Sequence, residues 1–300
     1  MDSSNPPCAT FLNRKCKAED STMVISKRAR FYAKYYQQNF SMPDSIIFYV
    51  AKNPKTAELY LKMVKTCKYF FVKNPIIIIP NLYASGGKWR VNGKPLDLTK
   101  YNCKCWITDR IHASANEFVD KNIFSPIIPK LYQCGAKSLY LTDQIISYHN
   151  LSFIISSAES IIFNNVIVKH ADGSDAPLED TVAIAIKACQ ISFTKPTITP
   201  KTMKELTKLP IFLKLDNFVL FNPSEVFDID AFYSYMKKNL HTKFFLNFDE
   251  QIIDAFKNRL ETIVDEILET KQLNYKPPLI NFTELDFEKY VKLRQIYNSH

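Results

Sequence analysis

The 300-residue sequence contains only five glycines, and this scarcity excludes a class of binding site. Loops that cradle phosphates need closely spaced glycines, because the backbone must approach the anion in conformations that other residues avoid. The one adjacent pair, Gly86-Gly87, stands alone in a predicted loop. We therefore do not expect a nucleotide-binding site of the glycine-rich type.

Long apolar runs are also missing. The longest purely aliphatic stretch is Ile76–Ile79, between Pro75 and Pro80, whereas a membrane-spanning helix needs about 20 apolar residues. The N-terminus has no apolar segment of the kind found in secretion signals. We expect an intracellular protein, in the cytoplasm, the nucleus or both, with no membrane partner.

The seven cysteines are odd in number and show no framework spacing, so a disulfide scaffold is not expected. Cys103 and Cys105 resemble half of a zinc motif, but no second pair lies at matching spacing. None of the five histidines shares a motif with a cysteine. A Cys–His pair assembled only by the fold remains an open alternative. We assign no catalytic residue, metal or cofactor, and we predict a non-enzymatic binding protein.

Charge is distributed unevenly along the chain. Residues 1–137 carry 22 Lys and Arg against 9 Asp and Glu, whereas residues 138–300 carry 17 against 21. The first part is therefore strongly basic and the second slightly acidic. Such asymmetry indicates two parts with different partners, and an acidic partner suits the first.

The N-terminal third divides into three predicted segments. Residues 1–40 are basic and are expected to be flexible, with a possible helix over 27–38. Residues 41–80 are expected to form a small helical module, because Pro43 suits a first helical turn and apolar stripes follow on both sides of a break at Asn53-Pro54. Residues 81–104 are expected to be a linker or insert, with a hairpin at Asn92-Gly93.

From residue 105 to 248, short apolar strands alternate with helix-like stretches. The strand-like strings begin at residues 105, 139, 161, 191, 213 and 244, and helices are predicted over 151–158, 178–188, 200–209 and 229–239. Alternation of this kind predicts an α/β fold with a parallel sheet. The strings recur at steps of 22 to 34 residues, and this repetition predicts an irregular, open helix–strand solenoid. Residues 249–300 are expected to form a C-terminal helical cap, with helices over 249–270 and 281–297, that covers the last strand edge.

Two short strings in the helical module are similar to a known family. Met42-Pro43-Asp44-Ser45-Ile46-Ile47 and Thr66-Cys67-Lys68-Tyr69-Phe70 resemble the opening and the close of a divergent F-box. The array that follows resembles the leucine-rich-repeat-like regions of the many divergent F-box proteins of nematodes. Strings such as Cys134–Leu141 and Ser157–Phe163 carry this second resemblance.

The resemblance implies a substrate adaptor for a ubiquitin ligase of the Skp1–cullin–F-box type. The helical module would bind a Skp1-like adaptor, the array would bind a protein target whose identity is unknown, and the chain itself would catalyse nothing. The residues implied in adaptor binding are Met42, Pro43, Ile46, Ile47, Cys67, Lys68 and Phe70.

Two alternatives remain. The array can serve as a protein-binding module without ligase contact, in which case Ile46, Ile47 and the Cys67–Phe70 face would pack against residues 81–110. The basic N-terminal part, in which Lys27–Arg30 precede several aromatic residues, can instead bind nucleic acid.

Overall fold

The computed structural model describes residues 29–30, 33, 40–97, 102–115, 121–248 and 252–299. The chain divides into two compact parts, Met1–Ser41 and Met42–His300, and the second is described here. Most of the predicted basic segment, including the helix expected over 27–38 and the nucleic-acid-binding alternative that depends on it, falls outside the described residues.

Three short helices open the second part, as the apolar stripes predicted: α2 (Asp44–Lys52), α3 (Ala57–Thr66) and α4 (Lys68–Lys73). The hydroxyl of Thr56 caps α3 by accepting a hydrogen bond of 3.1 Å from the backbone of Leu59. Cys67 ends α3 and its thiol caps α4. The chain then enters the sheet at Ile76, so the extended run predicted before Pro80 is the start of a strand.

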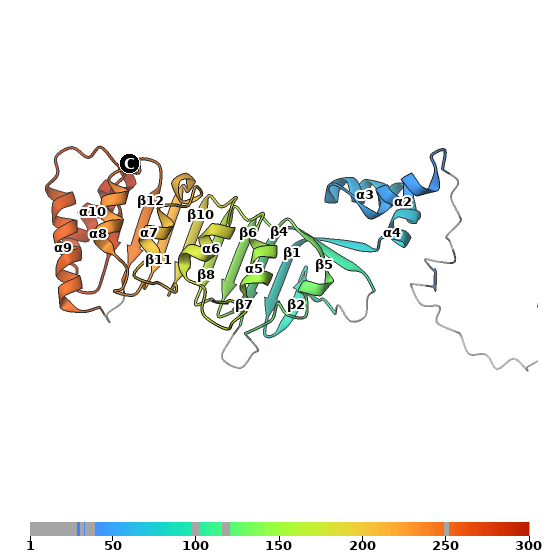
Figure 1. The fold of residues 1–300 in the computed structure, drawn as a ribbon, viewed down its shortest axis with the longest axis horizontal. Coiled ribbons are helices and arrows are strands. Elements are labelled where there is room, and N and C mark those ends of the chain that lie inside the picture. Colours follow the sequence, from blue (N-terminus) through green and yellow to red (C-terminus); the bar gives the residue numbers. More distant parts are fainter. Residues whose placement is uncertain are drawn as a thin grey trace, which may run out of the picture. The chain divides into compact units, whose positions relative to one another are not determined.

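A large, mostly parallel sheet follows, shown in Figure 1. Its order is β13-β12-β11-β10-β8-β6-β4-β1-β2-β3, with β5 pairing to β4 beside this path. The strands are β1 (Ile76–Ser85), β2 (Lys88–Val91), β3 (Lys94–Pro95), β4 (Lys104–Ser114), β5 (Leu131–Cys134), β6 (Ser138–Thr142), β8 (Ser160–Asn164), β10 (Gln190–Thr194), β11 (Asn217–Phe221), β12 (Lys243–Asn247) and β13 (Leu279–Asn281). A second sheet pairs β7 (Ile145–Ser147) with β9 (Ile167–Lys169). Within the described ranges the large sheet is open and does not close into a barrel.

From β4 to β13, strand order along the sheet follows chain order, and neighbouring strands stay in register. Leu139, Ile161, Ile191, Phe218 and Phe244 lie side by side on successive strands. These five residues are buried, whereas the residue that follows each of them along its strand is half-exposed. The alternation arises because successive side chains of a strand point to opposite faces.

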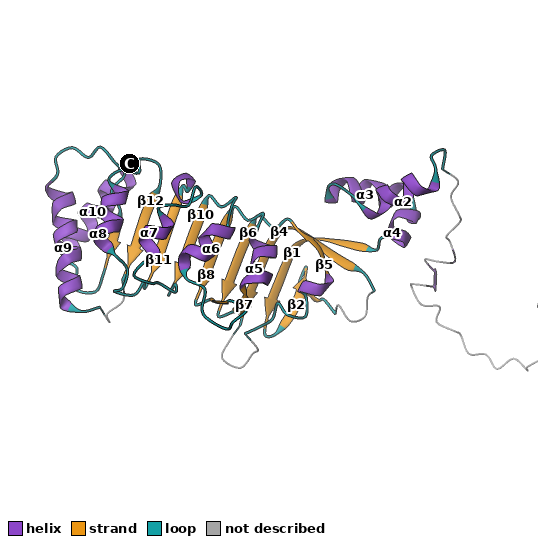
Figure 2. Ribbon diagram, viewed as in Figure 1, coloured by secondary structure: helices purple, strands orange, loops and turns teal. Residues whose placement is uncertain are grey.

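Helices cover one face of this sheet, as Figure 2 shows. They are α5 (Tyr148–Ile155), α6 (Leu178–Ile184), α7 (Thr202–Leu206) and α8 (Ile229–Met236), with two short 3-10 helices, η1 (Ile128–Lys130) and η2 (Phe212–Lys214). The four α-helices were predicted from the sequence, although each ends earlier than expected. One hydrophobic core, running from Ile79 to Leu293, joins the helix layer to the sheet.

Four successive strands of the array are each followed by a residue in the left-handed backbone conformation. Asp143, Asn165, Lys195 and Asn222 have φ angles of 50–54° and follow β6, β8, β10 and β11 directly. The backbone N–H of each donates to the last carbonyl of the next strand, as Lys195 does to Phe221 at 2.8 Å. The chain therefore leaves each strand through the same turn.

The predicted linker over residues 81–104 is wrong. The second half of β1 and the strands β2 and β3 lie within it, and all three belong to the large sheet. The hairpin at Asn92-Gly93 is confirmed, because β2 and β3 pair across it and both residues have positive φ. Pro80 lies at an irregularity in the β1–β4 pairing, where its missing N–H is tolerated.

Two strand positions also differ from the prediction. Leu213 lies in η2 and is exposed, and the strand starts four residues later, at Asn217. The first strand-like string was expected to begin at Cys105 and to match the string at Leu139. The strand β4 is longer than expected, and its residue opposite Leu139 is Ile111.

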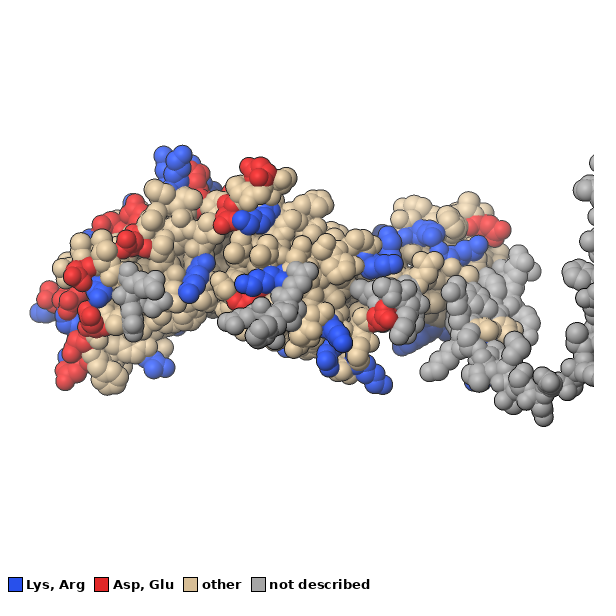
Figure 3. Space-filling model, turned by 90° about the horizontal axis from the view of Figure 1, so that it is seen from below, with Lys and Arg blue, Asp and Glu red and all other residues tan. Residues whose placement is uncertain are grey.

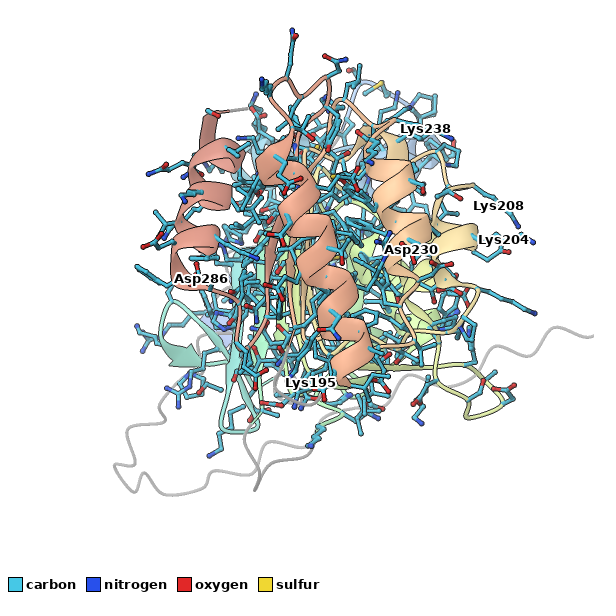
Figure 4. The ribbon with its side chains drawn as sticks, turned by 90° about the vertical axis from the view of Figure 1, so that its left-hand side faces the viewer. Lys195, Lys204, Lys208, Asp230, Lys238 and Asp286 are labelled. Carbon is cyan, nitrogen blue, oxygen red and sulfur yellow. The ribbon has the colours of Figure 1, made fainter. Side chains whose placement is uncertain are left out.

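The C-terminal cap contains one more strand than expected. The helix predicted over 249–270 is α9 (Asp254–Glu269), and the helix predicted over 281–297 is α10 (Phe287–Ser299). Between them β13 pairs with β12 and extends the sheet. Figure 4 shows α9 across this end of the sheet, with α8 on one side and α10 on the other. Among the described residues, no helix combines the length and the apolar character needed to cross a bilayer.

Candidate docking surfaces

The first helix of the module exposes an apolar stripe. Ile46 and Val50 are four residues apart and so lie on one face of α2, and Met42 lies just before the helix begins; all three are exposed. Phe48, Tyr49, Leu59 and Leu61 add further exposed apolar side chains on α2 and α3. Seven large apolar residues left in solvent within twenty positions form the kind of surface that marks an interaction site.

The other faces of the same helices hold the module together. Ile47 and Ala51 of α2 are buried, as are Tyr60 of α3 and Phe70 of α4. Helix α4 contacts both α2 and α3. The exposed stripe is thus one side of an amphipathic helix whose opposite side is already occupied.

Hydrogen bonds fix the module to the sheet. The amide of Asn74 donates to the carbonyl of Ala51 at 3.0 Å, and the hydroxyl of Tyr132 donates to the carbonyl of Lys52 at 3.1 Å. A small core of Tyr60, Ile76 and Trp106 lies at this junction. These contacts fix the position of α2, and with it the exposed stripe, relative to the sheet.

The seven predicted contact residues fall into three groups by exposure. Met42, Pro43 and Ile46 are exposed, and Cys67 and Lys68 are half-buried. Ile47 is 2% exposed and Ile46 is 48% exposed, although they are neighbours. The side chains of Ile47 and Phe70 are already covered, so these two residues support the helices from inside and are not available to a partner. Phe48, Tyr49, Val50, Leu59 and Leu61, which the family motif does not single out, join the exposed group.

Positive charge surrounds this surface. Residues 42–74 carry six lysines and only two acidic residues, Asp44 and Glu58. Glu58 forms an ion pair of 2.8 Å with Lys62, which offsets one of these charges. Figure 3 shows Asp and Glu gathered at the α9–α10 end, so the uneven charge of the sequence persists in the fold.

A second candidate surface is the face of the sheet opposite α5–α8. Its central row consists of Tyr83, His112, Tyr140, Ile162, Ser192, Val219 and Phe245 on adjacent strands. The rings of Tyr83 and His112 lie 6.1 Å apart, and those of His112 and Tyr140 lie 4.5 Å apart. Burial and the nearby guanidinium of Arg110 lower the pKa of His112, which favours a neutral ring at neutral pH.

Cations flank the aromatic end of this row. Arg90 pairs with Tyr83 across β1 and β2, and Arg110 lies two residues before His112 on β4. Both arginines are exposed, and no acidic side chain alternates with them on this face of the described strands. The surface therefore favours partners that combine apolar or aromatic side chains with negative charge.

The cysteine-based alternatives gain no support from the geometry. Burial raises the pKa of Cys105 and of Cys134 to about 11, so both thiols stay protonated at neutral pH. Burial also raises the pKa of Cys103. Among the described residues, no three His, Cys, Asp or Glu side chains lie together in a way that could hold a metal ion.

Comparison with models of known protein families finds no match to this chain, and a search of curated proteins finds none either. Function therefore has to be inferred from the surfaces themselves.

Proposed function

We propose that this chain is a substrate adaptor of a ubiquitin ligase, in which α2–α4 act as an F-box-like module that binds a Skp1-like adaptor. The observation that carries the proposal is the apolar stripe of Ile46 and Val50 on α2, with Met42 just before it, which the chain leaves exposed on a helix that is hydrogen-bonded to β5 through Lys52 and Tyr132. An amphipathic helix with an unoccupied apolar face fits a partner that supplies a hydrophobic groove.

The array from β4 to β13 is, in this proposal, an irregular solenoid of the leucine-rich-repeat-like kind that selects the target protein. Strands that follow chain order in one sheet and leave through one type of turn support this assignment. The open face with Tyr83, His112 and Tyr140 is the surface we assign to the target. The chain contributes binding and positioning, and the ligase would supply the chemistry.

Co-purification with a Skp1-like protein tests the proposal. Ile46→Asp places a charge in the middle of the stripe, and we expect it to abolish recovery of the adaptor. Ile253→Asp is the matched control, because Ile253 is the same residue type and is also exposed, at the distant start of α9. Equal recovery with both variants, or no recovery with the unmodified chain, contradicts the proposal.

A second candidate function is a protein-binding array without ligase contact, in which α2–α4 only cap the sheet. The packing of Tyr60 on Ile76 and Trp106 favours it, because this contact buries part of the module against the sheet. Under this alternative Ile46→Asp leaves every binding activity of the chain unchanged.

A further inference from the structure

The same pattern of buried and exposed residues recurs in the turns that lead into β10, β11 and β12. Four consecutive residues are buried, exposed, exposed and buried in three successive units: Ala185-Ile186-Lys187-Ala188, Phe212-Leu213-Lys214-Leu215 and Asn239-Leu240-His241-Thr242. In all three, the first exposed residue is aliphatic and the second is basic. Ile186, Leu213 and Leu240, here called the aliphatic strip, are 65%, 55% and 64% exposed.

The fold itself does not require these apolar side chains. The preceding unit has the same turn, Ile155-Ser156-Ser157-Ala158, in which serines occupy the two middle positions, where the other three turns have their exposed residues. Its backbone makes the equivalent bond, from Glu159 N–H to the carbonyl of Lys137 at 2.8 Å, which Cys189 and Asp216 repeat at 2.8 Å in the next two units. Serine thus satisfies the turn, and the aliphatic residues need another explanation.

A hollow lies beside the strip. Leu213, Tyr235, Lys238, Asn239, Leu240 and His241 line a volume of about 570 Å³. Asn239 fixes its wall, because its side-chain oxygen accepts from the backbone of both His241 and Thr242 at 2.9 Å. The amide nitrogen of Asn239 also donates to the hydroxyl of Tyr235 at 2.9 Å. The hollow is therefore preformed, with apolar and cationic groups around it.

The charge around the strip is positive and largely uncompensated. Lys187, Lys204, Lys214 and Lys238 are exposed and form no ion pair within the described part of the chain. Of the nearby acids, Glu205 binds Lys208 at 2.7 Å and Asp216 lies 3.0 Å from the ring of His241, whereas Glu159, whose carbonyl accepts from Cys189, has an exposed side chain. Figure 4 shows Lys204, Lys208 and Lys238 on the same side of the molecule, where α7 and α8 lie. An anionic partner would neutralise this side.

We propose that the aliphatic strip is a docking site for an acidic amphipathic helix of a partner protein. Neighbouring parallel strands lie about 4.8 Å apart, which is close to the rise of about 5.4 Å in one helical turn. Apolar residues one turn apart on a helix can therefore follow equivalent residues of successive units. A preformed hollow suits an inserted side chain, which a flat lipid surface does not provide. The site is separate from the stripe on α2 and does not depend on the proposed ligase docking.

A peptide titration of the full chain tests this proposal. The probe is a synthetic helical peptide with leucines one turn apart and glutamates beside them. A second peptide replaces each glutamate by lysine, and vesicles of phosphatidylcholine and phosphatidylserine form a third probe. The key variant is I186S/L213S/L240S, which copies Ser156 of the preceding unit. V226S/I253S removes two exposed apolar residues elsewhere, which are 45% and 57% exposed, and is the control.

We expect only the acidic peptide to bind, with a loss of affinity of about tenfold or more in the strip variant and none in the control variant. Lys187→Ser/Lys214→Ser should weaken binding and reduce its dependence on salt. Circular dichroism and thermal melting establish that the variants remain folded. Equal binding to the strip variant, or no binding to the unmodified chain, overturns the proposal. Vesicle binding that the strip variant loses, without peptide binding, would replace the helix by a membrane surface.

Discussion

The hydroxyl of Tyr60 donates a hydrogen bond of 2.6 Å to the backbone carbonyl of Asn74. The same oxygen accepts a bond of 3.1 Å from the backbone N–H of Ile76, the first residue of β1. One buried side chain on α3 thus satisfies two backbone groups where the helices meet the sheet. The orientation of the exposed stripe on α2 depends on this junction.

Tyr60→Phe should destabilise the protein by about 1–3 kcal/mol, because it leaves a buried carbonyl and a buried N–H without partners. Chemical denaturation measures the change. Tyr49→Phe is the control, since Tyr49 is exposed on α2 and its hydroxyl is in water. A variant as stable as the control would show that water replaces the tyrosine hydroxyl.

Tyr60 also predicts a loss of stability at alkaline pH. Burial raises its pKa above the ordinary value of 10.0. In the unfolded chain the phenol loses its proton first, so the stabilising contribution is fully present below about pH 10 and falls as pH rises further. Denaturation at about pH 9 and about pH 11 should show a larger loss for the unmodified chain than for Tyr60→Phe. Equal losses would mean that Tyr60 ionises normally in the folded state.

The register of the array predicts unequal effects for neighbouring residues of β11. Phe218→Ala should cost about 3–5 kcal/mol, because Phe218 is fully buried beneath the helix layer. Val219→Ala, on the opposite face, should cost about 1 kcal/mol or less. Thermal or chemical unfolding of both variants provides the comparison. Similar costs would contradict the assignment of one covered and one open face.

The turn after β10 predicts an unusual preference at Lys195, whose φ is 54°. Lys195→Asn should preserve or slightly raise stability, because asparagine tolerates this conformation and occupies it at Asn165 and Asn222. Lys195→Val should destabilise by about 1–2 kcal/mol, since a β-branched side chain clashes there. If valine is accepted as well as asparagine, the turn after β10 does not have the shared form.

Much of the array could be predicted because its periodicity is local. Leu139, Ile161 and Ile191 were predicted at strand starts, and each lies at the same register position of its strand. Leu213 misled the prediction because two alternating patterns overlap there, Leu213/Leu215 and Phe218/Leu220. Phe212 is buried and begins the 3-10 helix η2, so the strand forms on the second pattern and starts at Asn217. A three-residue strand such as β13, directly after Pro277-Pro278, is too short to give a pattern.

The sequence predicts where the exposed apolar surface of the helical module lies, but not which of its residues are exposed. Ile46 and Ile47 look alike in the sequence, and only the packing of α2 on α4 decides that Ile47 is covered and Ile46 is not. The only sequence signal of the aliphatic strip is a constant spacing, which is hard to notice because the strand-like strings begin at uneven steps. Its members lie 27 residues apart, and their equivalence depends on the register of β10, β11 and β12.

A calorimetric titration of the full chain with a Skp1-like adaptor tests the central claim most directly. We predict a one-to-one complex with a dissociation constant in the range of about 1 μM or below. Ile46→Asp should weaken this complex by about 30-fold or more, as expected for a central apolar contact. Ile253→Asp should leave it unchanged. No detectable binding, or an affinity that Ile46→Asp does not alter, would contradict the assignment of α2–α4 as an adaptor-binding module.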